Sequence, residues 1–133
     1  MADDLALMKH GRILQTGSPR DCYLKPVSTS AARLLGEMNL LPAVVKNGRA
    51  VTAFGAVPAT SGTTVMARPE ALRLADEGVA ATVVEARYAG ATTVITLAAG
   101  GTFARARTPS AQTPAPGSVI RVSLDPGLCS VFD

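Results

Sequence analysis

Hydrophobic and polar residues alternate with a period of two along much of the chain after residue 39. In the stretch 118–124, Ile120, Val122 and Leu124 share one face, while Arg121 lies on the other. Such alternation is typical of a β-strand with one buried side. Similar patterns predict strands over residues 40–46, 49–54, 63–68, 81–88, 92–97 and 102–107. Turn signals recur roughly every 8 to 12 residues, which favours a small barrel or sandwich.

Glycine-containing turns join several of these predicted strands. Asn47-Gly48 and Gly100-Gly101 are hairpin signals, because asparagine and glycine tolerate the positive φ of a tight turn. The stretch up to Gly62 that follows the strand 49–54 is rich in Gly, Pro, Ser and Thr, so we expect a loop there. In the strand 81–88 we expect Val84, Ala86 and Tyr88 to share one face.

The beginning of the chain predicts a β-hairpin and two short helices. Apolar runs at 5–8 and 12–16 flank a turn with Gly11, Ser18-Pro19 opens a helix, and a second helix is expected over 29–35. These elements are too small for a substantial core of their own. We therefore divide the chain into residues 1–38 and residues 39–133.

Composition and charge narrow the functional classes. Hydrophobic residues make up 47% of the chain and charged residues 17%, which excludes a disordered tail. No apolar run reaches the roughly 18 residues of a membrane-spanning helix, and the acidic start Met1–Asp4 is unlike a signal peptide. We therefore expect a cytoplasmic location. The 13 basic residues are scattered and aromatic residues make up only 4%, so we expect no nucleic-acid partner.

Residues that could carry catalysis are scarce. His10 is the only histidine. A metal site with two histidines is therefore excluded, and a Ser/His/Asp triad would have to use His10. The sequence has no G-x-x-x-x-G-K-[ST] loop for nucleotide phosphates. Cys22 and Cys129 are interpreted as free thiols, and Asp3-Asp4 and Asp76-Glu77 as solvated carboxylates beside turns. We expect no catalytic, cofactor-binding or metal-binding residue in this chain.

A long motif covers the start of the chain: A-D-D-L-A-L-M-K-H-G-R-I-L-Q-T-G-S-P-R-D-C-Y-L-K-P, from Ala2 to Pro26. It resembles the end of the nucleotide-binding domain of ATP-binding cassette (ABC) import ATPases, with Asp4 where that family usually has arginine and Cys22 where leucine is common. The continuation L-G-E-M-N-L-L, Leu35–Leu41, resembles the junction to the family's C-terminal transport-associated OB (TOBE) domain.

Further motifs in the second half resemble the same domain. They are Arg68-Pro69-Glu70 at a strand end, Glu85–Gly90 before a turn, and Pro116–Val119 with Val131–Asp133 at the close. The resemblance implies a mainly β fold. It would be a small OB-like (TOBE) barrel over 39–133, preceded by a hairpin and two short helices left from the nucleotide-binding domain over 1–38.

The resemblance also implies a function, that of the regulatory and dimerisation domain of the ATP-hydrolysing subunit of an ABC importer. The parent subunit would use ATP and Mg, contact a membrane permease and lie on the cytoplasmic side of the inner membrane. The junction is most similar to ATPases for ferric iron, polyamines or thiamine. The family's catalytic motifs, its switch histidine included, lie N-terminal to Ala2, so we expect a fragment without ATP hydrolysis. We also expect self-association through residues 5–16, whose edge and apolar face would lack their usual partner.

A free-standing small-ligand or oxyanion-binding OB-like module is the alternative. Ser61, Thr63, Thr64 and Arg68 offer hydroxyl groups and a guanidinium to an anion, although nothing in the sequence fixes their convergence. Single-stranded nucleic acid is a third class of ligand for OB folds, and the shortage of aromatic residues argues against it.

Overall fold

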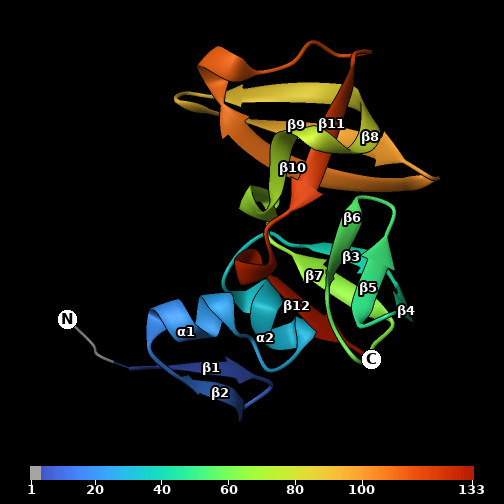
Figure 1. The fold of residues 1–133 in the computed structure, drawn as a ribbon. Coiled ribbons are helices and arrows are strands. Elements are labelled where there is room, and N and C mark those ends of the chain that lie inside the picture. Colours follow the sequence, from blue (N-terminus) through green and yellow to red (C-terminus); the bar gives the residue numbers. More distant parts are fainter. Residues whose placement is uncertain (1–3) are drawn as a thin grey trace.

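The computed structural model describes residues 4–133 as a mainly β molecule with two short α-helices (Figure 1). The predicted fold class, mainly β with a hairpin and two short helices at the start, is confirmed. Residues 1–3 lie outside the described part, and with them the acidic start of the chain and the first carboxylate of Asp3-Asp4. Within residues 4–133, no helix is long and apolar enough to cross a membrane.

The N-terminal segment, residues 4–38, begins with a hairpin. β1 (Leu5–Lys9) pairs antiparallel with β2 (Arg12–Gly17). Its turn residues, His10 and Gly11, have φ values of 53° and 77°, which matches the turn expected from the glycine. The helices pack against this hairpin and share a small buried core with it, made of Leu7, Cys22 and Ala31.

Both helices of the N-terminal segment are short and capped by serine. α1 (Pro19–Leu24) follows Ser18, whose hydroxyl accepts a hydrogen bond from the third residue of the helix. α2 (Thr29–Leu34) follows Ser28, which caps it in the same way. Each cap satisfies a backbone N–H that has no partner inside the helix, so these local sequences define where the helices start.

Three antiparallel sheets make up the β module, residues 39–133 (Figure 1). The first has the order β12-β7-β3, with bounds Cys129–Phe132, Thr64–Ala67 and Asn39–Pro42. The second has the order β4-β5-β6, with bounds Val44–Lys46, Arg49–Thr52 and Gly55–Pro58. The third has the order β10-β9-β8-β11, with bounds Thr102–Pro109, Thr92–Ala99, Leu72–Ala89 and Val119–Leu124. Single turns of 3-10 helix cover Pro69–Ala71, Ser110–Gln112 and Pro126–Leu128.

One hydrophobic core joins these three sheets. Phe54 and Leu41 are fully buried in it, together with alternate residues of β9 and β11. The predicted faces of β11 are confirmed, because Val122 and Leu124 are buried whereas Val119 is 66% exposed. The core is therefore built from the inward faces that the period-two pattern indicated.

The prediction of a single strand over 40–46 and a loop after residue 54 was wrong. The first stretch is two strands of different sheets, because β3 ends at Pro42 and pairs with β7, whereas β4 pairs with β5. β6 lies in the expected loop and pairs with β5. The glycine and proline in β6 favour a loop prediction, although β6 is a strand with one buried side chain, Val57.

β8 is longer than the predicted strand 81–88 and carries two irregularities. It starts at Leu72, and its pairing with β11 jumps between Leu74 and Ala80, so Asp76 and Glu77 lie inside the strand rather than beside a turn. Gly78 lies in this stretch so close to the carbonyl of Val122 that any Cβ would clash with it. The second irregularity, between Val83 and Glu85, leaves Val84 49% exposed, so the expected apolar face is interrupted there.

Candidate functional site

Arg68 is fully buried where the N-terminal segment meets the β module. It directly follows β7, and the guanidinium reaches back to the backbone of residues 23–37. Nη1 donates to the carbonyl of Ala32 at 3.0 Å and, at longer distances, to those of Gly36 and Glu37. Nη2 donates to the carbonyl of Tyr23 at 3.3 Å. One side chain of the β module therefore holds the ends of both helices of the N-terminal segment.

The ring of Tyr23 lies over the same guanidinium, 4.2 Å from its central carbon to the ring centroid. This cation–π contact shields the charge from water on one side. Desolvation lowers the pKa of Arg68 from its ordinary value, and the nearby Tyr23 and Glu70 act in the opposite direction. A guanidinium in this position stays charged, because its ordinary pKa lies far above physiological pH.

Glu70 extends the contact outward through a chain of charged groups. The hydroxyl of Tyr23 donates to Glu70 Oε2 at 2.6 Å, and Arg107 Nη1 lies 3.1 Å from Glu70 Oε1. Arg107 and Arg105 then approach the carboxylate of Glu37 at 3.9 Å and 3.4 Å. Burial, and then the hydrogen bond to Glu70, raise the pKa of the Tyr23 hydroxyl, so it remains a donor at neutral pH. We call these six residues and Asn39 the seam: Tyr23, Glu37, Asn39, Arg68, Glu70, Arg105 and Arg107.

Asn39 joins two sheets at the centre of the seam. Its amide Nδ2 donates to the carbonyls of Ala67 and Arg105, at 3.2 Å and 2.8 Å. Its Oδ1 accepts from the backbone N–H of Arg105 at 2.8 Å. Because β3 and β10 belong to different sheets, this side chain fixes their edges relative to each other.

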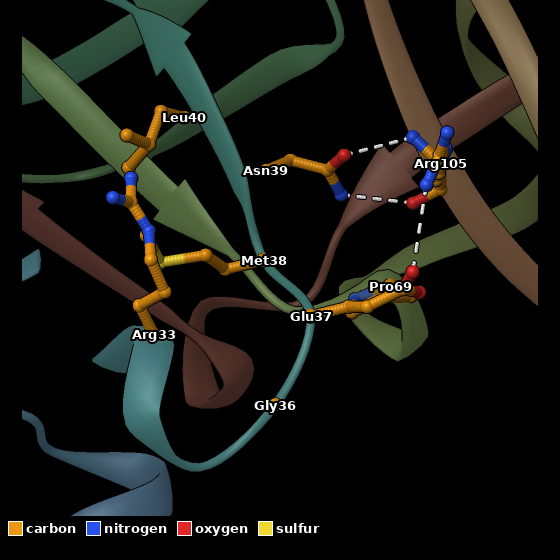
Figure 2. Close-up of a pocket in the computed structure, with 8 residues that line it drawn as sticks. All are labelled: Arg33, Gly36, Glu37, Met38, Asn39, Leu40, Pro69 and Arg105. Atoms are coloured by element: carbon orange, nitrogen blue, oxygen red, sulfur yellow. Dashed lines mark hydrogen bonds and ion pairs between the residues drawn. The ribbon is translucent and has the colours of Figure 1, made fainter. Parts of the chain in front are cut away.

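A pocket of about 400 Å³ opens beside the seam (Figure 2). Residues from both parts of the chain line it: Arg33, Gly36, Glu37, Met38, Asn39, Leu40, Pro69 and Arg105. Figure 2 shows Asn39 and Glu37 directed toward Arg105, whereas Arg33 extends from α2 along the other side of the connecting segment. The volume lies within the range of small-molecule sites.

The four residues proposed from sequence for an anion do not come together. Ser61 and Thr63 are exposed in the loop before β7, and Thr64 is half-buried at its first position. Arg68 follows the other end of that strand, so its backbone lies about 13 Å from that of Thr64 at the rise of an extended chain. Its guanidinium is buried among backbone carbonyls. Arg68 therefore serves the seam, and the three hydroxyl groups lie apart from it.

The remaining candidate residues are also dispersed. His10 is exposed in the first hairpin, and Cys22 is buried in the small core. Burial, with a smaller effect of Asp125, raises the pKa of the Cys129 thiol to about 12, so this thiol is protonated at neutral pH. Within residues 4–133, no group of three or more His, Cys, Asp or Glu side chains could hold a metal ion.

Several seam residues belong to motifs of the sequence, but among them only Arg68 had an expected role, that of an anion ligand. Glu37 and Asn39 belong to the L-G-E-M-N-L-L junction, and Arg68 and Glu70 belong to the R-P-E motif. The structure shows that these two motifs meet. Tyr23 belongs to the Ala2–Pro26 motif, in which it had no expected role, and Arg105 and Arg107 belong to no quoted motif. The contacts of all three join segments that lie far apart in the sequence, which a single sequence does not show.

The chain is similar to ATP-binding proteins of import systems along most of its length. The chain is 36% identical, over an alignment of 156 residues, to the spermidine/putrescine import ATP-binding protein PotA of Methylococcus capsulatus. That match covers 96% of this chain and 40% of PotA. It is 32% identical to the Fe(3+) ions import ATP-binding protein FbpC of Streptomyces avermitilis, covering 94% of this chain and 39% of that protein. The chain thus spans about two fifths of the length of these curated relatives.

The family assignment rests on the β module. A sequence profile of the TOBE domain matches residues 65–132, slightly more than half of the chain. The matched stretch starts within β7, includes Arg68-Pro69-Glu70 of the seam and ends with β12. The names of the relatives include iron(III) and polyamine importers, two of the three solute classes that the motifs implied. By its sequence and by the β module that carries the match, the chain belongs to the TOBE domain family.

Proposed function

We propose that the chain is the regulatory and dimerisation domain of the ATP-hydrolysing subunit of an ABC import transporter. The observation that carries the proposal is the extent of the match to import ATP-binding proteins. It covers 94% or more of this chain in PotA and in FbpC of Streptomyces avermitilis, and so includes both the N-terminal segment and the β module. In this proposal ATP and Mg are bound by other parts of the parent subunit, which contacts a membrane permease on the cytoplasmic side of the inner membrane.

The proposal assigns different roles to the two parts of the chain. Residues 1–38 belong to the ATP-binding part of the subunit, and residues 39–133 form the TOBE domain. The seam supports this division of roles, since Arg68 of the β module holds backbone carbonyls at the ends of α1 and α2. Movement of the ATP-binding part would reach the TOBE domain through these contacts.

Dimerisation gives the domain a second purpose in this proposal. A contact between two TOBE domains, outside the sites of ATP hydrolysis, keeps the two ATP-binding parts at high effective concentration when they separate. The exposed apolar residues of the hairpin, Met8 and Ile13, and the two free edges of its two-stranded sheet support a further contact there.

Two measurements test this function. Light scattering on the purified chain is expected to give a dimer whose fraction increases with concentration, and a strict monomer at millimolar concentration would contradict the dimerisation role.

Sequencing the genomic DNA in frame upstream of the Met1 codon is expected to reveal a phosphate-binding loop and a signature motif. A stop codon and a ribosome-binding site directly before Met1 would contradict the parent subunit. The alternative of a free-standing ligand-binding module would then be favoured.

A further inference from the structure

We propose that two copies of the chain associate through the outer face of the second sheet, which meets an acidic bulge of β8 in the other copy. This inference rests on the proposed function, because it names the surfaces through which the two TOBE domains would dimerise. The outer face is made of the outward side chains of β4, β5 and β6, namely Val44, Lys46, Arg49, Val51, Ala56 and Pro58. The acidic bulge is the stretch 75–79 of β8, which contains Asp76 and Glu77.

The outer face of the second sheet combines an apolar row with a basic row. Side chains of directly paired residues share a face of the sheet, so Val44, Val51 and Ala56 form one row. Val44 is 59% exposed and Val51 is 43% exposed. Lys46 and Arg49 are paired in the neighbouring row of the same face, and both are exposed. An apolar patch beside charged groups is the composition of a protein–protein contact surface.

The basic row carries two positive charges that nothing in the described chain neutralises. Lys46 lies directly opposite Arg49, and like charges in this position destabilise a sheet. Within residues 4–133, neither side chain forms an ion pair. Arg49 donates to the carbonyl of Ala56 at 3.1 Å, which leaves its charge in place. A dimer in which the two outer faces meet each other is therefore disfavoured, since it would bring four cations together.

The acidic bulge has the charge that complements the basic row. Residues 75–79 have no pairing partner on β11, and Asp76 and Glu77 are exposed among them. In the described part of the chain, neither carboxylate forms an ion pair. Arg121 holds the bulge against β11, because its Nη1 donates to the carbonyl of Gly78 at 2.9 Å. Even with Arg121 included, the bulge has a net negative charge at neutral pH.

The places of the two surfaces in the fold suit a two-fold dimer. Gly55 at the start of β6 lies against Leu124 of β11, so the second sheet is followed by β11 and then by β8. The basic row lies on β4 and β5 at one end of this succession of strands, and the bulge lies on β8 at the other end. In an isologous dimer, a contact from one surface to a second surface occurs twice. A two-fold axis near β6 and β11 would therefore place each basic row on the partner's bulge.

Reversal of the charges tests this contact on the full chain. One variant carries Lys46→Glu and Arg49→Glu, and the other carries Asp76→Lys and Glu77→Lys. Each variant alone would oppose like charges at both contacts, so its dimer should be weaker than the wild-type dimer by at least about thirtyfold in analytical ultracentrifugation. In an equimolar mixture of the two variants, with one of them fluorescently labelled, both contacts again join opposite charges. Heterodimers should then form with an affinity within about threefold of the wild-type dimer.

A matched control is the variant with Arg20→Glu and Arg87→Glu. Both arginines are exposed and lie outside the two surfaces, and their replacement changes the net charge as much as the reversal of the basic row does. The control dimer should stay within about threefold of the wild-type affinity. As a measurement that needs no variant, raising NaCl from 50 to 500 mM should weaken the wild-type dimer by about tenfold, because salt screens exposed charges.

The outcomes separate this inference from the proposed function. A wild-type chain that stays monomeric contradicts the dimerisation role itself. If the wild-type chain dimerises, the inference alone is overturned by charge variants that behave like the control. It is also overturned by folded variants whose mixture forms no heterodimer, or by a dimer that does not respond to salt. The melting temperature of each variant establishes that it is folded.

Discussion

The N-terminal segment and the β module are stabilised in different ways. The core of the β module contains 16 buried residues from three sheets, whereas the core of the N-terminal segment contains three. The smaller part is held to the larger one by polar contacts, above all the carbonyls that Arg68 binds. The N-terminal segment therefore keeps its position through the seam rather than through its own core. Changes in the core should therefore unfold the whole chain, and substitution of Arg68 should release only the segment.

The largest expected effect is the loss of the β-module core. Phe54→Ala removes a fully buried aromatic side chain, which should lower the free energy of unfolding by about 3–5 kcal/mol. Both parts should lose protection together, as measured by chemical denaturation and by amide hydrogen exchange. If the amides of the N-terminal segment stayed protected while those of the β module exchanged, the segment would be stable on its own. That result would contradict its dependence on the seam.

Substitution of Arg68 should separate the two parts. Arg68→Met keeps an apolar stem of similar length but leaves the backbone carbonyls of Tyr23 and Ala32 without their donor, at a cost of about 3 kcal/mol. The loss should be confined to the N-terminal segment. Cys22, which is fully buried in its small core, should then react with a thiol reagent much faster than in the wild-type chain.

Cys129 in the β module gives the internal reference for that assay. Its reactivity should stay low in the Arg68→Met variant, because its protonated thiol remains in place. Arg73→Met is the matched control, since Arg73 is exposed and makes one surface ion pair with Asp125. Equal acceleration at Cys22 in both variants, or acceleration at Cys129, would show that Arg68 has no special role at the seam.

The junction between two sheets should show a smaller effect. Asn39→Ala removes three hydrogen bonds and leaves the backbone N–H and carbonyl of Arg105 without those partners, which should cost about 2 kcal/mol. Amide exchange should accelerate at Arg105 and its neighbours in β10 and β3, while the second sheet remains protected. Uniform acceleration over all three sheets would instead mean that Asn39 supports the entire core.

The smallest effect concerns alkaline pH. Cys129 has its pKa raised from 9.0 to about 12, so the stability linked to its protonated thiol is complete below pH 9 and is lost as the pH rises toward 12. Between pH 8 and 10 this loss should be about 1 kcal/mol, allowing for the partial exposure of the thiol. Cys129→Ser should remove that part of the pH dependence in denaturation measurements. An unchanged slope would assign the alkaline loss to other groups, such as Tyr23, whose pKa is also raised.

The sequence predicted those elements whose signals are local. Ser18 caps a helix where expected, α2 starts at the expected residue 29, and Asn47-Gly48 forms a tight turn with φ values of 52° and 76°. The predictions from sequence were wrong where contacts between distant residues determine the secondary structure. β8 continues through Asp76 and Glu77 because β11 pairs on both sides of them, and no local pattern encodes that pairing.

The candidate site was predictable only in part, for the same reason. Arg68 stood out as part of a motif, but its burial depends on carbonyls that lie more than 30 residues away in the sequence. Asn39 likewise belongs to a sequence motif that does not indicate its partner, since its contact with Arg105 spans 66 positions. A single sequence shows which residues are unusual, and the fold decides which of them meet.

Asn39 also has a consequence for solubility. β10 is the outer strand of its sheet, and the backbone groups of Arg105 point away from β9 into a position where another extended chain could attach. The side-chain amide of Asn39 occupies both groups as a neighbouring strand would. The middle of this edge is thereby closed to strand addition, so one asparagine protects the sheet against the edge-to-edge association that leads to aggregation.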